Sequence, residues 1–221
     1  MTVRTITLFC AALAASLMLC SCAADFDLSG PGTVYINEYV DVSDVQTMVH
    51  PQNHPMQKLT AVVLPLRIHQ RVDDHRYLSR ELTRTLLQKW QQNEVFPVIT
   101  FAPDAKWTTA ANAMPIARAA HADLIVAGDI THVMFGGTQG ETNLAVRVEI
   151  YDASTGSLIW SMAQAGQMSP GHTKDFIFFT QQSRMPMEPI QAIMSTIATD
   201  IGAPVADWNQ PVQDPGADSA L

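Results

Sequence analysis

The sequence predicts an α/β fold, a three-layer arrangement in which helices flank a mixed sheet. Two apolar patterns support this prediction. Residues 60–66 and 124–127 are apolar on both faces, as in strands at the centre of a sheet. From 142 to 152 apolar and polar residues alternate, as in a strand with one face in water. A turn sequence at 152–156 and a second alternating run at 157–166 complete an antiparallel hairpin.

The remaining elements place helices between the parallel strands, with right-handed crossovers. Leu78, Leu82, Leu86 and Trp90 recur on one face and give the clearest helix. In chain order we expect strand 33–39, strand 60–66, helix 76–92, strand 95–101, helix 110–121, strand 123–130, strands 142–152 and 157–166, an irregular stretch from 168 to 189, and a terminal helix at 188–201. The core should contain Val62, Leu64, Leu82, Leu86, Ile125, Val146, Val148 and Trp160.

The amino terminus has the parts of a bacterial lipoprotein signal peptide. Arg4 supplies a positive charge, and 6–19 is an apolar run that is too short to span a bilayer. The junction that ends at Cys22 has Leu19 at position −3 and Ser21 at position −1, which resembles the lipobox. We therefore expect cleavage before Cys22, which would carry the lipid, palmitate included. The alternative is an ordinary secreted protein with chance cysteines.

This interpretation divides the chain into four parts. They are a signal peptide at 1–21, a tether at 22–32, a single domain at 33–203 and a flexible tail at 204–221. Cys22 is followed by Ala23 and Ala24, whereas lipoproteins of this class that stay in the inner membrane typically have an aspartate there. The expected location is thus the outer membrane, with the lipid as anchor and the domain facing the periplasm.

The composition excludes several classes of function. The formal net charge of −8 is unfavourable for a nucleic-acid partner, because binding to phosphates requires clustered Lys and Arg. The three cysteines all lie at or before Cys22. The folded part therefore offers no disulfide, no thiolate metal site and no cysteine nucleophile. We expect no cofactor other than the covalent lipid.

Few polar residues form a recognisable chemical site. His50 and His54 are four apart, but Pro51 and Pro55 argue against the helix that would join them in a metal site. Asp129 follows a buried strand, which is a common ligand position in open α/β sheets. The motifs GxSxG and HExxH do not occur. We expect no metal site and no enzyme activity, with a hydrolase or small-ligand site at Asp129 as the alternative.

An apolar segment before the terminal helix is the candidate for a contact surface. Phe176, Phe178, Phe179, Met185 and Met187 place bulky side chains in a stretch that does not alternate and is broken by proline. Aromatic and methionine side chains are enriched at the centres of interfaces. Two interpretations stay open, an apolar element packed on the sheet and an exposed patch for a partner or for the membrane surface.

The motifs between residues 59 and 166 resemble one group of proteins. They are AVVLPL, LSRELTRTLLQKW, VFPVIT, ARAAHADLIVAGDIT and LAVRVEIYDASTGSLIW. This pattern is similar to the periplasmic lipoproteins that include the curli-secretion lipoprotein CsgG, the penicillin-binding-protein activator LpoB and the amino-terminal domain of TolB. The resemblance covers about half the chain. Its most specific elements are 122–128 with Ile130, and Asp152 with Thr155 and Gly156.

The resemblance implies a role class and no reaction, because members of the group bind proteins or build assemblies. It implies a non-catalytic accessory or assembly subunit of a cell-envelope complex, acting through an envelope protein partner. The alternative is a subunit of an oligomeric outer-membrane secretion channel, hence a homo-oligomer. Two features depart from the group. The loop 134–141 is too short for a transmembrane hairpin, and the tether is short for an activator that reaches through the cell wall.

Overall fold

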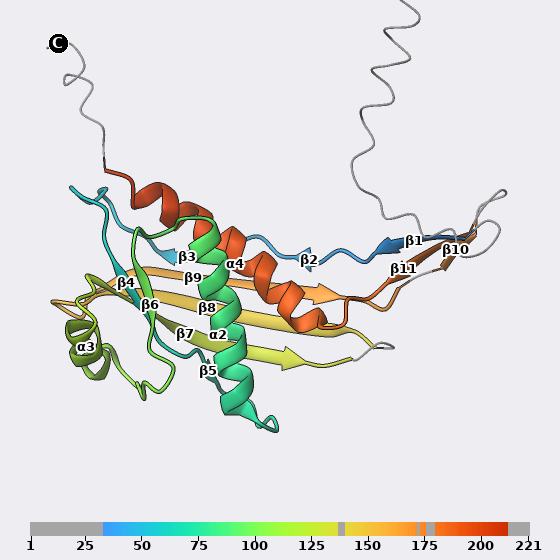
Figure 1. The fold of residues 1–221 in the computed structure, drawn as a ribbon, viewed down its shortest axis with the longest axis horizontal. Helices are drawn as coiled ribbons and strands as arrows, with labels where there is room; N and C mark the ends of the chain where they lie inside the picture. The colour runs from blue at the N-terminus through green and yellow to red at the C-terminus, as the bar shows by residue number, and fades with distance from the viewer. Residues whose placement is uncertain (1–32, 137–139, 172, 176–179, 212–221) are drawn as a thin grey trace, which may run out of the picture. The chain divides into compact units, whose positions relative to one another are not determined.

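The computed structural model describes residues 33–136, 140–171, 173–175 and 180–211 (Figure 1). The chain forms two compact units, Glu38–Pro170 with Met185–Leu221, and Met1–Asn37 with Gly171–Arg184. The larger unit contains the predicted α/β fold. The expected domain at 33–203 therefore spans both units, because its first strand pairs with a segment near residue 180 and not with the main sheet.

The main sheet has eight strands within the described part of the larger unit, and it is mixed as predicted. Its central path runs in the order β2-β9-β8-β7-β4-β6, while β3 pairs with β9 and β5 pairs with β7. The strands are β2 (Asp41–Val42), β3 (Gln46–Val49), β4 (Ala61–Val63), β5 (Arg67–Ile68), β6 (Ile99–Phe101), β7 (Leu124–Met134), β8 (Thr142–Asp152) and β9 (Leu158–Met168). Strands β6, β4 and β7 are parallel, and β7, β8 and β9 are antiparallel.

Three helices of the larger unit flank this sheet: α2 (His75–Gln92), α3 (Ala110–Ala119) and α4 (Pro189–Trp208). The chain passes from β4 through α2 to β6, and then through α3 to β7 on the other side of β4. Right-handed crossovers in opposite directions place their helices on opposite faces of the sheet. Accordingly α2 and α4 share one core with the sheet, and α3 forms a second core on the other face (Figure 1). We call the α2–α4 side the inner face and the α3 side the outer face.

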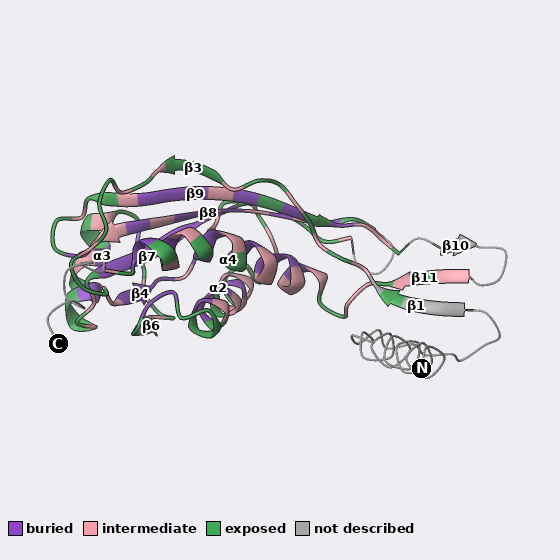
Figure 2. Cartoon of the chain, turned by 90° about the horizontal axis from the view of Figure 1, so that it is seen from above, coloured by how far each residue is buried: buried purple, intermediate pink, exposed green. Residues whose placement is uncertain are grey.

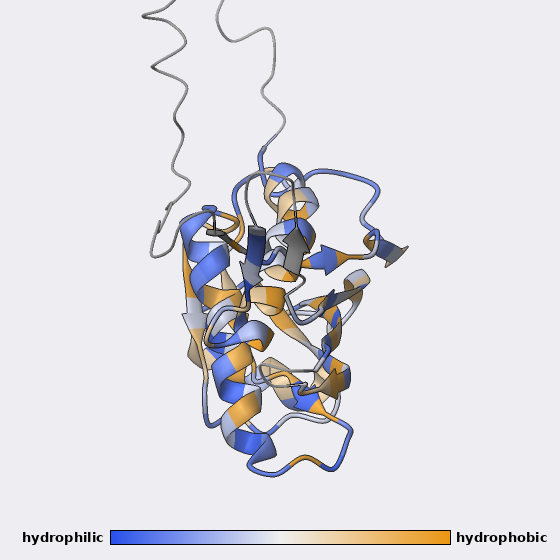
Figure 3. Cartoon of the chain, turned by 90° about the vertical axis from the view of Figure 1, so that its right-hand side faces the viewer, coloured by the Kyte–Doolittle hydropathy of each residue, from blue (hydrophilic) through white to orange (hydrophobic). Residues whose placement is uncertain are grey.

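The two cores contain the residues that the apolar patterns predict. Every residue of the expected core is buried, on one face or the other: Val62, Leu64, Leu82, Leu86, Ile125, Val146, Val148 and Trp160. Figure 2 shows this burial concentrated in the strands and on the sides of the helices that face them. Figure 3 shows hydrophilic and hydrophobic residues interleaved along the helices. Such interleaving is the pattern of a helix with one face on a core.

Close packing joins α4 to α2. The indole Nε1 of Trp90 on α2 donates a hydrogen bond of 2.8 Å to the carbonyl of Ala198 on α4. A Cβ on Gly202 would lie 2.8 Å from that nitrogen, so only glycine lets the two helices approach here. The predicted end of α4 at residue 201 is wrong, because the helix continues through Pro204 to Trp208. The burial of Val205 and Trp208 explains why the helix continues past these two breakers.

Two other predicted boundaries change for physical reasons. The strand expected at 95–101 is paired in register only at β6, whereas Val95 and Phe96 lie before it and are buried without strand pairing. The run is therefore apolar because it packs in the core. Pro65 lies between β4 and β5, as expected for a residue that cannot donate to a ladder, and its carbonyl accepts a hydrogen bond from Trp107 Nε1 at 3.0 Å.

The smaller unit is a three-stranded sheet in its described part. Its strands are β1 (Thr33–Asn37), β10 (Thr173–Asp175) and β11 (Thr180–Arg184). Strand β11 lies in the middle, parallel to β1 and antiparallel to β10. The stretch expected to be irregular from 168 to 189 thus contains two strands. Their residues are mostly polar, so the segment lacks the apolar alternation that reveals a strand.

Candidate interaction surface

The outer face of the main sheet is covered over its parallel half only. Helix α3 packs its buried Ala113 and Ala117 against a core that includes Val62 and Ile125. Across β8 and β9 most outward-pointing residues are instead half-buried or exposed, although Ser161 is buried, and no described helix other than α4 makes substantial contact with these strands. We call this region the open outer face; it contains Ala145, Arg147, Glu149, Ala163 and Ala165.

A buried carboxylate marks the boundary of the open outer face. Asp129 on β7 is 6% exposed, and its parallel register partner is Arg67 on β5. Arg67 donates from Nε to Oδ1 at 2.7 Å and from Nη2 to Oδ2 at 3.1 Å, a bidentate ion pair. The Nε2 of His69 lies 3.0 Å from the same Oδ1. Both oxygens of Asp129 are therefore occupied by side chains of the protein.

Arg67 is itself held in a fixed orientation. Its guanidinium lies 4.0 Å from the ring centroid of Trp107, a cation–π contact, and its Nη1 donates to the carbonyl of Thr108 at 2.9 Å. With the two bonds to Asp129, all three guanidinium nitrogens have acceptors. The ion pair thus ties β5, β7 and the loop after β6 together.

Three further polar residues of β8 lie on the same side of the sheet, Arg147, Glu149 and Tyr151. The hydroxyl of Tyr151 donates to Glu149 Oε2 at 2.7 Å, and burial together with this hydrogen bond raises the pKa of Tyr151 well above its usual range. Tyr151 therefore stays a neutral donor at physiological pH. Arg147, the register partner of Asp129 across β7 and β8, has its Nε buried without a hydrogen-bond partner in the described part of the chain.

The open outer face contains a shallow hollow beside its small residues. A cavity of about 430 Å³ lies over β2, β7, β8 and β9, with Ala145 and Ala165 in its lining. The rest of its lining is both apolar, from Val42, Leu144 and Gly166, and polar, from Asp41, Ser43, His132, Asn143 and Gln167. Small side chains and amides on a flat sheet suit contact with another polypeptide, because they permit close approach and offer donors and acceptors.

The structure gives different outcomes for the predicted contact residues. Cys22, Phe176, Phe178 and Phe179 lie outside the described residues, so their roles stay predictions. Met185 is partly buried and packs against the core on the α4 side. Met187 is fully exposed. The two methionines thus separate, one packing against the core and the other reaching solvent at the start of α4.

The histidines and the carboxylates do not gather into a metal centre within the described ranges. His54 instead has its Nδ1 2.9 Å from the carbonyl of Trp208 at the end of α4. None of the described helices is both long enough and apolar enough to cross a membrane.

Sequence reasoning placed Asp129 but missed Arg67 and His69. A signal was present, because two apolar runs each end in a charged residue, at Arg67 and at Asp129. Parallel neighbours with equivalent lengths bring such ends together. The register was the missing information, since a shift by one residue would place the two side chains on opposite faces.

No family model matches the chain, and no curated protein matches it either. Among solved structures, the PelC dodecamer from Paraburkholderia phytofirmans is similar with a TM-score of 0.50 at 16% identity, covering 73% of this chain and 98% of that chain. This likeness shows a shared fold.

Two further solved structures are more distant in shape. The LpoB C-terminal domain from Escherichia coli has a TM-score of 0.36 at 15% identity, covering 50% of this chain and 84% of that chain. Lipoprotein GNA1162 from Neisseria meningitidis has a TM-score of 0.32 at 13% identity, covering 48% of this chain and 78% of that chain. The structural neighbours thus include LpoB, which the sequence motifs resemble, and a lipoprotein, both at low identity.

Proposed function

We propose that this protein is a lipoprotein anchored through Cys22 in the outer membrane and facing the periplasm. In this proposal it is a non-catalytic accessory or assembly subunit of a cell-envelope complex and acts through protein–protein contacts. The observation that carries the proposal is the open outer face, because the helices complete the core without covering it. The lipobox-like junction and the neighbours LpoB and GNA1162 agree with the envelope location.

The arrangement around Asp129 favours contact over catalysis. Both oxygens of Asp129 accept hydrogen bonds from Arg67, and Oδ1 also lies 3.0 Å from His69 Nε2, so most of its acceptor sites are engaged before any substrate arrives. Using Asp129 in chemistry would first require breaking a bidentate ion pair. As a structural pair it instead fixes the edge of the open outer face.

Site-specific photo-crosslinking in intact cell envelopes tests this proposal. A crosslinking amino acid at Ala165, an exposed position of the open outer face, should give a discrete adduct. The same amino acid at Ala119, an exposed position on α3, should give none. Ala165→Arg should abolish the native complex, and Ala119→Arg, the same change of size and charge, should leave it intact. Equal behaviour of the two positions would refute the assignment of the surface.

A second candidate is that the partner is another copy of this chain. It is favoured by the PelC structure, which is a dodecamer and shares the fold over 98% of its chain. Native mass spectrometry of the detergent-extracted protein separates the two candidates. A homo-oligomer that Ala165→Arg dissociates would support self-assembly, whereas a complex with a different protein would support the accessory role. Acyl mass on a peptide that begins at Cys22 would confirm the anchor in the same preparation.

A further inference from the structure

A second cavity of the larger unit lies at the carboxyl end of β4, where three segments meet. It has a volume of about 460 Å³ and is lined by β5 and the residues before it, by the first two turns of α2, and by the loop after β6. Buried Leu66 and Trp107 contribute its apolar surface. We call it the cationic cavity after four of its lining residues, Arg67, Arg76, Arg80 and Lys106.

The charge of this cavity opposes that of the chain. Four Lys or Arg and one acid, Asp104, line it, which gives a formal charge of +3 with His75 neutral. The chain as a whole carries −8. The hollow of the open outer face has no Lys or Arg in its lining. Positive charge is therefore concentrated locally in an otherwise acidic protein, and the local field favours anions.

Much of this positive charge is not neutralised by the protein. Arg67 pairs with Asp129, and Arg80 pairs with Asp104 at 2.6 Å, but the Asp104 side chain is 86% exposed. Arg76 and Lys106 are exposed and form no ion pair within the described residues. An anion that enters the cavity would therefore meet two unpaired cations, Arg76 and Lys106. It would also meet Arg80, whose partner Asp104 is largely hydrated.

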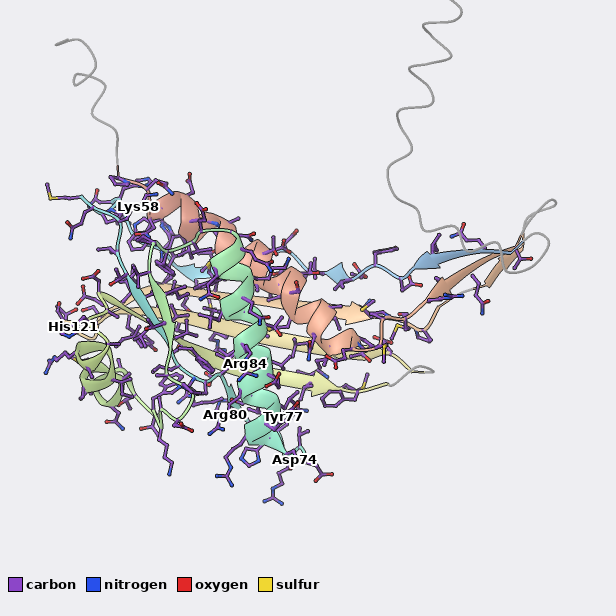
Figure 4. The ribbon with its side chains drawn as sticks, in the orientation of Figure 1. Lys58, Asp74, Tyr77, Arg80, Arg84 and His121 are labelled. Carbon is purple, nitrogen blue, oxygen red and sulfur yellow. The ribbon has the colours of Figure 1, made fainter. Side chains whose placement is uncertain are left out.

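The arrangement of the cations is unfavourable for the helix that carries them. Arg76, Arg80 and Arg84 follow one another at four-residue spacing, which places like charges side by side on one face. The first turn of α2 has no acidic residue, although its positive dipole end favours acids and disfavours Arg76. Figure 4 shows Arg80 and Arg84 along this helix with Tyr77, which is 68% exposed. Arg84 pairs with Glu81 and Arg80 with Asp104, whereas Arg76 forms no ion pair within the described residues. A bound anion would offset the unfavourable position of Arg76.

We infer that the cationic cavity binds a phosphate-bearing ligand. A phosphate monoester carries nearly two negative charges and three acceptor oxygens, which match the two unpaired cations Arg76 and Lys106 better than a single carboxylate does. Guanidinium groups bind phosphate through paired N–H donors, and a lysine adds a point charge. Arg67 is already oriented by Asp129 and Trp107, so binding costs it little conformational entropy. The phosphate comes from a soluble compound or from a lipid headgroup.

Two binding assays on the chain from Ala23 onward, which lacks both the expected signal peptide and the lipid anchor, test the inference and distinguish the sources. Calorimetric titration with inorganic pyrophosphate tests a soluble phosphate. Flotation with vesicles that contain phosphatidic acid, whose headgroup is a phosphate monoester, compared with phosphatidylcholine vesicles, tests the headgroup. The cavity variant is Arg76→Gln with Lys106→Gln, both exposed and without ion pairs in the described part, so the fold should persist. Circular dichroism verifies this.

The matched control is Lys58→Gln with Arg118→Gln, which removes the same charge from exposed positions outside the cavity lining. Lys58 lies far from Arg80 in Figure 4. We expect the cavity variant to weaken binding on the order of tenfold, because two charge-assisted contacts are lost, and the control to change it little. This difference in the pyrophosphate assay supports a soluble ligand, and the same difference with anionic vesicles alone supports a lipid headgroup. Equal losses in both variants, or no binding in either assay, would overturn the inference.

Discussion

The parallel and antiparallel halves of the main sheet differ in how helices cover them. All three residues of β4 are buried, because one of its faces belongs to the core that includes α2 and α4 and the other to the core of α3. On β8 buried and half-buried residues alternate, because α4 packs on the inner face alone. The fold needs both faces of β4 but only one face of β8. The residues on the outer side of the antiparallel half are therefore not constrained by the core, and they can be selected for function.

The boundary between the halves shows the same difference in its electrostatics. Asp129 on β7 is fully paired inside the parallel half. Its antiparallel neighbour Arg147 is half-buried, and its Nε has no partner in the described chain. A buried polar atom without a partner costs stability. Such an atom at the edge of the open outer face is consistent with a contact that forms in a complex.

The largest expected effect compares two register partners on the outer face. Ile125 on β7 is fully buried under α3, and it lies opposite half-buried Tyr151 on β8. Ile125→Ala should lower the free energy of unfolding by about 2–5 kcal/mol, because it removes apolar contacts and leaves a cavity. Tyr151→Ala should cost about 1–2 kcal/mol, since it loses partial burial and one hydrogen bond. Urea denaturation measures both, and similar losses would show that the halves are equally covered.

The next effect concerns the ion pair at the boundary. Asp129→Asn keeps the shape of the side chain but leaves Arg67 facing a neutral group. We expect a loss of about 1–3 kcal/mol in the free energy of unfolding, below the figure for a fully buried pair, because the Arg67 side chain is 32% exposed and partly hydrated. Glu149→Gln, on the open outer face, is the control and should cost less.

Asp129→Asn also decides between structural and chemical roles. If the variant kept full stability and yet lost a cellular phenotype, the alternative of a hydrolase or small-ligand site at Asp129 would be favoured. A loss of stability with unchanged function in the surviving folded protein would confirm a structural ion pair.

The sequence predicts those parts of the fold in which local pattern and packing agree. The stripe from Leu78 to Trp90 and the alternation across β8 each follow from one element meeting one core. The smaller unit could not be predicted, because β1 pairs with β11 at a separation of 147 residues (Thr33 with Thr180) and β11 is polar. The end of α4 was missed since burial of Trp208 outweighs the local preference of Gly202 and Pro204.

The candidate surfaces were harder to predict than the fold. The cationic cavity joins residues from 65 to 107, and its charge becomes visible only when the first turns of α2 meet the loop after β6. The open outer face is defined by the fact that no described helix covers it, which depends on how far α3 extends over the sheet. Both surfaces depend on how several elements pack against one another, whereas sequence periodicity describes one helix or strand at a time.

The smallest expected effect concerns the turn between β8 and β9, where the stability of the fold should depend on pH through a single carboxylate, Asp152. Burial raises the pKa of Asp152, but hydrogen bonds from Ser154 and Thr155 outweigh it, so the pKa falls below its usual value. The backbone N–H groups of these two residues donate to Oδ1 at 2.8 and 2.7 Å, and Gly156 follows with a φ of 73°.

A carboxyl whose pKa is lower in the folded state stabilises the fold above its unfolded pKa, and this stability is lost as pH falls through the folded value. Asp152→Asn should therefore be less stable than the wild type near pH 7, and the difference should shrink below about pH 4. Urea midpoints measured from pH 2 to pH 7 follow this window, with exposed Asp73→Asn as the matched control. A difference between Asp152→Asn and the wild type that stays constant with pH would mean that the turn does not depend on the charge of Asp152.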